Sequence, residues 1–209
     1  MKLYDYAKAP SPRRARMAVA EKGIAVEVVP VDLWAREQLS DAFKAINPQA
    51  LVPALVTDGG QVITENIAIA AYLEALQPEP PLFGTSPLER ARVLEWNARI
   101  EFELLMPTAE AFRNAHPNFK GRALPGPYDY EQIEALAERG RKRAPRFWPQ
   151  LDLRLAASRF VGGERFGFAD ITAVCALDFA AQAGLGPDPS LSHIGRWLEE
   201  AKARPSYAA

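Results

Sequence analysis

The sequence predicts an α/β N-terminal domain built on a mixed sheet, followed by an all-α helical-bundle domain. Up to Thr64, short β-branched runs alternate with stretches of helical periodicity. A stretch rich in proline, QPEPPLFGTS at residues 77–86, then interrupts the pattern, and no strand signal follows it. The 209 residues suffice for two small domains. We therefore expect domains at residues 1–78 and 87–209, joined by a linker at 79–86.

The chain begins with a strand, a helix and a second strand. Residues 2–7 (KLYDYA) alternate between two faces, as a strand does. Residues 13–23 read as a helix that ends at Gly23, a residue suited to a left-handed cap. Residues 24–31 (IAVEVVPV) are rich in β-branched side chains, and Pro30 favours an edge position for this strand.

A helix, a hairpin and a further helix complete the first domain. Residues 36–46 read as a helix that stops before Asn47-Pro48. ALVT and QVIT flank the turn DGG and form a hairpin over residues 54–64, and a helix follows at 65–76. The order βαβ and then αββα predicts a small α/β sandwich with a mixed sheet.

The second domain is predicted from its helical signals. Ser86-Pro87-Leu88-Glu89 has the pattern of a capping box, which starts a helix. That helix is expected over residues 88–115, with a kink at Pro107. Further helices are expected at 131–158, 169–184 and 191–203. The helix at 88–115 carries an apolar stripe, formed by Val93, Trp96, Ile100 and Leu104.

Composition excludes several function classes. The net charge of −1 lacks the basic excess expected of a nucleic-acid or anionic-membrane partner. The single cysteine, Cys175, excludes an internal disulfide framework and fits a cytoplasmic location. No stretch resembles a signal peptide or a membrane span. The two histidines, His116 and His193, form no metal-ligand pattern, so no metal is expected.

The segment APSPRRARMAVAEKGI at residues 9–24 carries the first chemical signal. Ser11 is expected to cap the following helix, because Pro12 suits the first helical position. A hydroxyl at that place lies in the positive potential of the helix N-terminus. Such a potential favours an anion, including a thiolate.

Three parts of the sequence together resemble the glutathione transferases, near the bacterial theta, nu and beta branches. They are LYDYAKAPSPRRARMAVAEKGI, FKAINPQALVPALVTDGGQVITENIAIAAYL and the linker followed by helices. The resemblance covers nearly the whole chain in the family's order. It implies a thioredoxin-like N-terminal domain that binds glutathione as co-substrate, an all-α C-terminal domain and a homodimer.

The resemblance also assigns the glutathione contacts. In the family the bond Val52-Pro53 is cis, and the free backbone of Val52 pairs with the cysteinyl unit of the tripeptide. Glu65 corresponds to the residue that holds the γ-glutamyl ammonium. Asn66, where the family has serine, lies beside the site of its carboxylate. Gln38 falls at a position whose side chain, in the family, faces the glycine end of glutathione.

The group that activates the thiol is left open between three candidates. Ser11 matches a nearby residue that is Ser or Asn in several bacterial branches, and it is the first candidate. The serine-class position itself falls on Ala9, and the catalytic cysteine of beta-type members falls on Pro10. A mixed-disulfide mechanism is therefore not expected. Tyr6 is the second candidate, and backbone amides alone are the third.

The resemblance places the second substrate between the domains, with Trp34, Met106, Phe112 and His116 as candidates for its wall. The leading hypothesis is conjugation of the glutathione thiolate to small electrophilic apolar compounds, as in detoxification. Two alternatives stay open. One is a non-catalytic ligand-binding or regulatory protein, and the other is a different glutathione-dependent reaction, such as that of a peroxidase, isomerase or dehalogenase.

Overall fold

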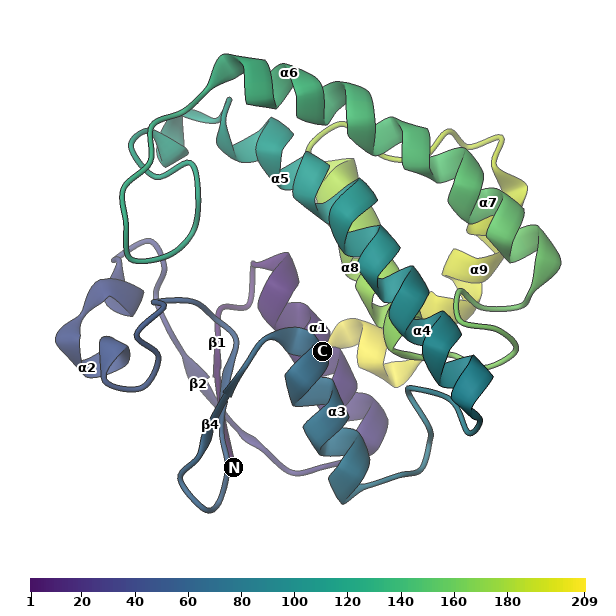
Figure 1. Ribbon diagram of the computed structural model, residues 1–209, viewed down its shortest axis with the longest axis horizontal. Helices are drawn as coiled ribbons and strands as arrows, with labels where there is room; N and C mark the ends of the chain where they lie inside the picture. The colour runs from purple at the N-terminus through teal and green to yellow at the C-terminus, as the bar shows by residue number, and fades with distance from the viewer.

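A four-stranded sheet forms one part of the molecule in the computed structural model, which describes residues 1–209 (Figure 1). Its strands are β1 (Lys2–Asp5), β2 (Glu27–Pro30), β3 (Ala54–Val56) and β4 (Val62–Thr64), in the order β2-β1-β3-β4. β1 and β2 are parallel, whereas β3 pairs antiparallel with both β1 and β4. The expected mixed sheet, its hairpin and the edge position of Pro30 are thus confirmed.

Two helices pack together beside this sheet, α1 (Pro10–Lys22) and α3 (Asn66–Leu76) (Figure 1). They share one apolar core with Leu3 of β1 and Leu55 of β3. Gly23 ends α1 with a φ of 61°, which confirms the left-handed cap. A side chain with a Cβ atom is disfavoured in this conformation, and glycine accepts it without strain.

The prediction of one continuous helix over residues 36–46 is wrong. The structure has a 3₁₀ turn (Glu37–Leu39) and a short α2 (Asp41–Lys44), separated by Ser40. Ser40 is extended, and its hydroxyl accepts a hydrogen bond from the N–H of Phe43 at 3.2 Å. Serine competes for backbone hydrogen bonds in this way, so it starts a new helix instead of continuing the old one.

The segment 77–86 contains no helix or strand, yet it is packed into the molecule. Leu82 and Phe83 are buried, and their N–H groups donate to the Glu74 carboxylate at 2.9 and 3.1 Å. The same carboxylate pairs with the buried Lys22 ammonium. These contacts join the segment to both α1 and α3.

The remaining chain is helical. Its α-helices are α4 (Pro87–Ile100), α5 (Met106–Arg113), α6 (Glu134–Arg143), α7 (Trp148–Ala157), α8 (Phe168–Gln182) and α9 (Ser192–Lys202). The capping box of Ser86 and Glu89 is present at the start of α4, as predicted. All four residues of the predicted apolar stripe are buried. The predicted all-α architecture is confirmed.

Two of the expected long helices are interrupted. A π-helical segment (Glu101–Leu105) joins α4 to α5 and ends two residues before Pro107, where a kink was expected. The helix expected at 131–158 begins only at Glu134, and a 3₁₀ segment (Ala144–Phe147) separates α6 from α7. Pro145 lies in that segment and has no N–H for the helical ladder.

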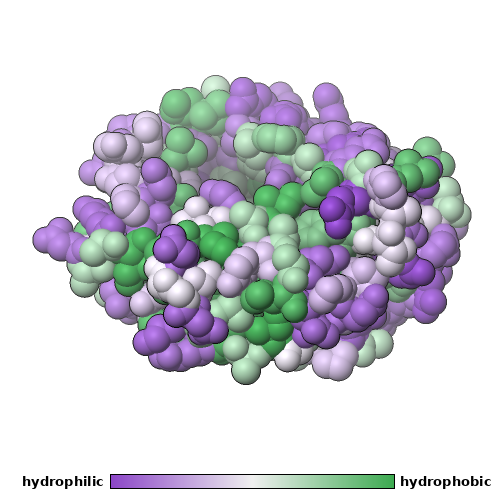
Figure 2. All heavy atoms as spheres, turned by 60° about the horizontal axis from the view of Figure 1, so that its bottom comes forward, coloured by the Kyte–Doolittle hydropathy of each residue, from purple (hydrophilic) through white to green (hydrophobic).

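Helix α8 lies at the centre of the molecule, packed against both α1 and α4. A continuous core of 34 residues runs from the sheet through α8 to Trp197 of α9. Through Ala15, Met17 and Ala18, this shared core holds α1 in place against the helical part. No helix combines the length and the apolar character needed to cross a membrane. Figure 2 shows apolar atoms gathered in the middle of one face between more hydrophilic margins.

Candidate functional site

The N-termini of α1 and α3 meet at one point of the structure. The side-chain amide of Asn66, the first residue of α3, donates from Nδ2 to Ser11 Oγ at 2.8 Å. The first N–H groups of any helix lack intrahelical acceptors, and the helix dipole makes that end positive. Two such ends together form a place that attracts anions.

The predicted role of Ser11 as the cap of α1 is wrong. The helix begins at Pro10, and Ala9 occupies the cap position with φ −96° and ψ 139°, without a capping side chain. Pro10 suits the first helical position, and the residue before a proline favours an extended backbone. Ser11 is consequently the second helical residue, and its hydroxyl reaches Asn66 instead of its own helix.

Two buried amide oxygens of the first domain have no hydrogen-bond partner. They are Oδ1 of Asn66, a residue only 3% exposed, and Oε1 of Gln38 in the 3₁₀ turn before α2. Buried polar atoms are nearly always paired, so each unpaired one requires an explanation. Both belong to residues to which the sequence assigns glutathione contacts. A bound polar ligand would supply the missing partners.

The backbone around Val52 is free for pairing. The Val52-Pro53 bond is cis, as predicted. Neither the N–H nor the C=O of Val52 forms a hydrogen bond within the chain, and β3 begins two residues later at Ala54. An unpaired segment of this kind can pair with an extended peptide as a strand edge does.

Glu65 stands directly before α3 in an unusual conformation. Its φ of 65° and ψ of 127° are rare for a residue with a side chain, and they cost conformational energy. Its carboxylate is exposed and has no ion-pair partner in the chain. Strained residues concentrate at functional sites, and a free carboxylate here can hold a cation.

Ion pairs fix the first turns of α1 against the helical part. Arg13 pairs with Asp178 of α8 at 2.5 Å, and Arg14 pairs with Glu101 of the π-helical segment at 2.5 Å. Arg14 is itself buried, whereas Arg13 is partly exposed. The two ion pairs place the start of α1 in a defined position relative to α8.

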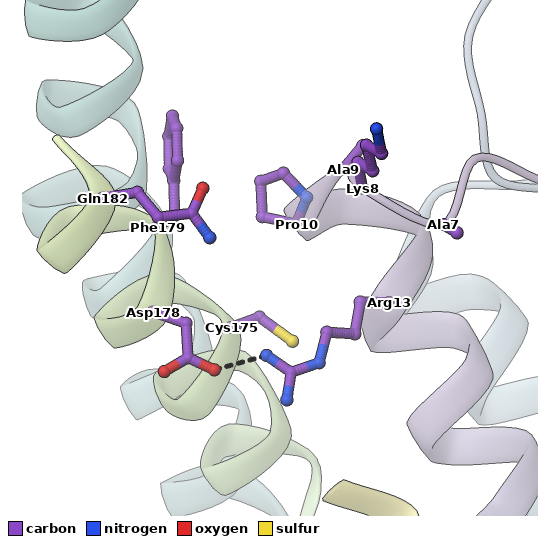
Figure 3. Close-up of a pocket in the computed structure, with 9 residues that line it drawn as sticks. All are labelled: Ala7, Lys8, Ala9, Pro10, Arg13, Cys175, Asp178, Phe179 and Gln182. Atoms are coloured by element: carbon purple, nitrogen blue, oxygen red, sulfur yellow. Dashed lines mark hydrogen bonds and ion pairs between the residues drawn. The ribbon is translucent and has the colours of Figure 1, made fainter. Parts of the chain in front are cut away.

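A pocket of about 400 Å³ opens between the loop after β1 and the end of α8 (Figure 3). Pro10 and Phe179 face each other across it, and the ion pair of Arg13 and Asp178 lies along one side. Gln182 turns its amide toward the same space. The pocket thus combines apolar walls with a few polar groups, as small-molecule sites do.

The four residues predicted for the second-substrate wall do not line this pocket. Phe112 packs on the pocket residue Phe179 at 5.6 Å between ring centroids, and His116 packs on Phe112 at 5.1 Å. Trp34 and Met106 are 54% and 46% exposed. The structure therefore brings Phe112 and His116 next to the pocket and leaves Trp34 and Met106 at the surface.

Sequence reasoning missed the α8 side of the pocket. Asp178 and Gln182 are polar residues four positions apart in a helix whose preceding turns are almost entirely buried. Residues at this spacing share a helix face. This pair of polar residues could have predicted that the end of α8 leaves the core and faces a pocket.

Two further side chains near α1, those of Cys175 and Tyr6, carry groups of the kind that act as nucleophile or activator. Burial raises the pKa of Cys175 to about 11, so its thiol stays protonated at neutral pH. Tyr6 follows β1, and its hydroxyl forms no hydrogen bond within the chain. No group of three or more His, Cys, Asp or Glu side chains is placed to hold a metal ion.

Family models match both parts of the chain. Residues 10–76 match the model described as "Glutathione S-transferase, N-terminal domain". Residues 97–205 match the model described as "Glutathione S-transferase, C-terminal domain". The two matched ranges include Ser11 and Asn66 in the first part and all the α8 residues of the pocket in the second.

Full-length relatives give the same result. The chain is 34% identical over 209 residues to Glutathione S-transferase 2 of Saccharomyces cerevisiae, covering 99% of this chain and 87% of that protein. It is 30% identical over 204 residues to maleylacetoacetate isomerase of Rattus norvegicus, covering 94% and 86%. The crystal structure of Gtt2 from Saccharomyces cerevisiae superposes with a TM-score of 0.90 at 34% identity, covering 100% and 99%.

Proposed function

Since the chain belongs to the glutathione S-transferase family, we propose that it joins the glutathione thiolate to small electrophilic apolar compounds. One observation carries this proposal. The hydrogen bond between Asn66 Nδ2 and Ser11 Oγ brings two positive helix N-termini and one hydroxyl to the same place. That arrangement suits a ligand with both a carboxylate and a thiolate, and glutathione has both.

The tripeptide is held along its length by the groups that the structure leaves unpaired. The γ-glutamyl carboxylate takes the free N–H groups at the start of α3, beside Asn66, and the ammonium takes the Glu65 carboxylate. The cysteinyl unit pairs with the backbone of Val52, next to Pro53. At the glycine end, the unpaired Oε1 of Gln38 accepts a hydrogen bond from the N–H of the glycine unit.

Catalysis consists mainly of lowering the thiol pKa and of proximity. The thiol gives its proton to water, and the Ser11 hydroxyl donates a hydrogen bond to the resulting thiolate. The sulfur then attacks an electrophilic carbon and forms a carbon–sulfur bond. Where the carbon belongs to a polarised double bond, the π electron pair moves to the other end of that bond, which takes a proton from water. Where the carbon carries a halide, the halide leaves with the electron pair of the bond that breaks. The electrophile occupies the pocket between Pro10 and Phe179.

Isomerisation is the second candidate, because relatives of this chain carry that name. Besides the rat protein, maleylacetoacetate isomerase of Pseudomonas aeruginosa is 43% identical over 94 residues, covering 44% of each chain. In such a reaction the same thiolate would add to a double bond and leave again. Glutathione would be returned unchanged, whereas conjugation consumes it. Measuring free thiol during turnover therefore separates the two reactions.

Replacing Ser11 with alanine is expected to raise the pKa of the bound glutathione thiol by about 1.5 units, because one hydrogen bond to the charged sulfur is lost. The measurement is the ultraviolet absorbance of the thiolate of bound glutathione, followed across pH. Ser192→Ala is the matched control, since Ser192 is an exposed serine in the first turn of another helix, α9. The control should leave the thiol pKa unchanged.

Two other results of this measurement would support a different activating group or a different function. A Ser11→Ala variant with an unchanged thiol pKa would transfer the role to Tyr6 or to the backbone amides. A wild-type protein that binds glutathione without lowering its thiol pKa would support the non-catalytic ligand-binding alternative.

We also propose a homodimer, for which light scattering should report twice the mass of one chain.

A further inference from the structure

We infer that Asn66 is a positioning residue whose amide couples binding of the glutathione α-ammonium group to the orientation of the Ser11 hydroxyl. This inference rests on the proposed function and deepens it. It starts from two observations on one buried side chain. Asn66 Nδ2 donates to Ser11 Oγ at 2.8 Å, and Asn66 Oδ1 has no partner.

The Ser11 hydroxyl has a single hydrogen atom, and its direction decides what the hydroxyl can offer to the sulfur. A serine hydroxyl has one hydrogen to donate and two lone pairs that accept. Because Asn66 donates to Ser11, the single hydroxyl hydrogen stays free to donate to a thiolate. If the amide turned over, Oδ1 would face Ser11 and take that hydrogen. The sulfur would then meet a lone pair, which repels a thiolate.

The orientation of the Asn66 amide depends on the group that its free end meets. Each orientation leaves one end of the buried amide without a partner inside the chain. A ligand group that donates to Oδ1 selects the orientation in which Nδ2 faces Ser11, and a ligand group that accepts selects the opposite one. The ligand therefore decides whether the Ser11 hydrogen is available.

The ammonium group is the donor that fits this place. The carboxylate of the γ-glutamyl unit has other partners, namely the free N–H groups at the start of α3. The ammonium is attached to the same carbon atom, so it lies within a few bonds of that carboxylate. Glu65, the residue before Asn66, supplies an unpaired carboxylate that draws the ammonium toward this side of the site.

The unpaired oxygen distinguishes Asn66 from the other buried asparagines. Asn47 uses both ends of its amide, donating to Leu51 O and accepting from Gln49 N. Asn114 likewise uses both ends. The oxygen of Asn97 lies 2.7 Å from the hydroxyl of Thr172, which donates to it. Among the buried asparagines, only Asn66 keeps an amide oxygen that no group of the chain satisfies.

The first test uses the wild-type protein and a glutathione analogue that lacks only the α-amino group, γ-glutaryl-cysteinyl-glycine. For each peptide the thiol pKa is measured free in solution and bound. The lowering on binding is expected to be smaller for the analogue by about half to one unit, because Oδ1 loses its donor. Equal lowering for the two peptides would overturn the inference.

The second test is a double-mutant cycle between Asn66→Ala and Ser11→Ala. Alone, Asn66→Ala should raise the bound thiol pKa by about half to one unit, because the Ser11 hydroxyl loses the group that orients it. In the Ser11→Ala background it should cause no further rise. Asn97→Ala is the matched control, since it also leaves a hydroxyl, that of Thr172, without its buried amide partner. It should leave the thiol pKa unchanged.

Two results of the double-mutant cycle would contradict the inference. An equal rise of the thiol pKa in both backgrounds, or no rise in either, would overturn the inference. Failure of the proposed function looks different, since wild-type protein would then not lower the thiol pKa of glutathione at all. If Asn66→Ala does not fold, the comparison of the two peptides on wild-type protein still decides the question.

Discussion

Replacing Asp170 with alanine is expected to lower the free energy of unfolding by about 3–5 kcal/mol. Asp170 is wholly buried in the first turn of α8. Its carboxylate accepts hydrogen bonds from Val161 N at 2.8 Å, Gly167 N at 2.9 Å and Trp197 Nε1 at 2.8 Å. Alanine would leave these buried donors unpaired, each at a cost of about 1–3 kcal/mol.

Urea unfolding monitored by circular dichroism would measure this loss as a lower midpoint. Asp188→Ala is the control, because Asp188 is an exposed aspartate that accepts a single backbone hydrogen bond, from Ser190 N at 2.8 Å. That variant should lose less than about 1 kcal/mol. If the two variants unfolded at the same urea concentration, Asp170 would not have the structural role described.

Asp170 also predicts a dependence of stability on pH. Burial raises the pKa of Asp170 to about 6 in the folded chain, although the three N–H donors oppose the rise. A carboxyl group whose pKa is raised by folding binds its proton more tightly in the folded state. Its contribution to the free energy of unfolding therefore falls as pH rises from about 4 to about 6. The difference in the free energy of unfolding between wild type and Asp170→Asn, measured by urea unfolding, should fall as pH rises from about 4 to about 6 and stay constant above pH 6.

Replacing Gly140 with alanine is expected to lower the free energy of unfolding by about 3 kcal/mol. Gly140 lies where α6 crosses α5, and a Cβ atom there would come within 2.3 Å of Pro107 O and 2.6 Å of Ala111 N. Both neighbours are backbone atoms, so the two helices would have to move apart. This cost exceeds the gain of about 1 kcal/mol that alanine brings to a helix interior.

Gly195→Ala is the matched control for this prediction. Gly195 also lies within a helix, α9, but a Cβ atom there would meet nothing within 4 Å. The same substitution should therefore raise the free energy of unfolding by about 0.5–1 kcal/mol. Opposite signs for the two variants are the expected result, measured by thermal and urea unfolding. Equal effects would contradict the close helix crossing at Gly140.

Local sequence patterns determined much of the fold. The left-handed cap at Gly23, the capping box at Ser86 and the hairpin at 54–64 were all predicted, because each depends on residues within a few positions of one another. Where a local pattern allowed two outcomes, prediction failed. The serine at position 40 could continue a helix or cap a new one, and in the structure its hydroxyl caps α2, whose Phe43 is buried.

In the candidate site, too, some features were predictable from sequence and others were fixed only by the tertiary structure. The sequence by itself determined which residue types stand at Ser11, Val52, Glu65 and Asn66, and their family pattern indicated glutathione. Only the tertiary structure decided that Asn66 reaches the Ser11 hydroxyl and that α8 closes the pocket. The first contact joins residues 55 positions apart, and the ion pair of Arg13 with Asp178 joins residues 165 apart. Such distances along the chain are bridged by burial of one shared core, and periodicity and caps carry no information about them.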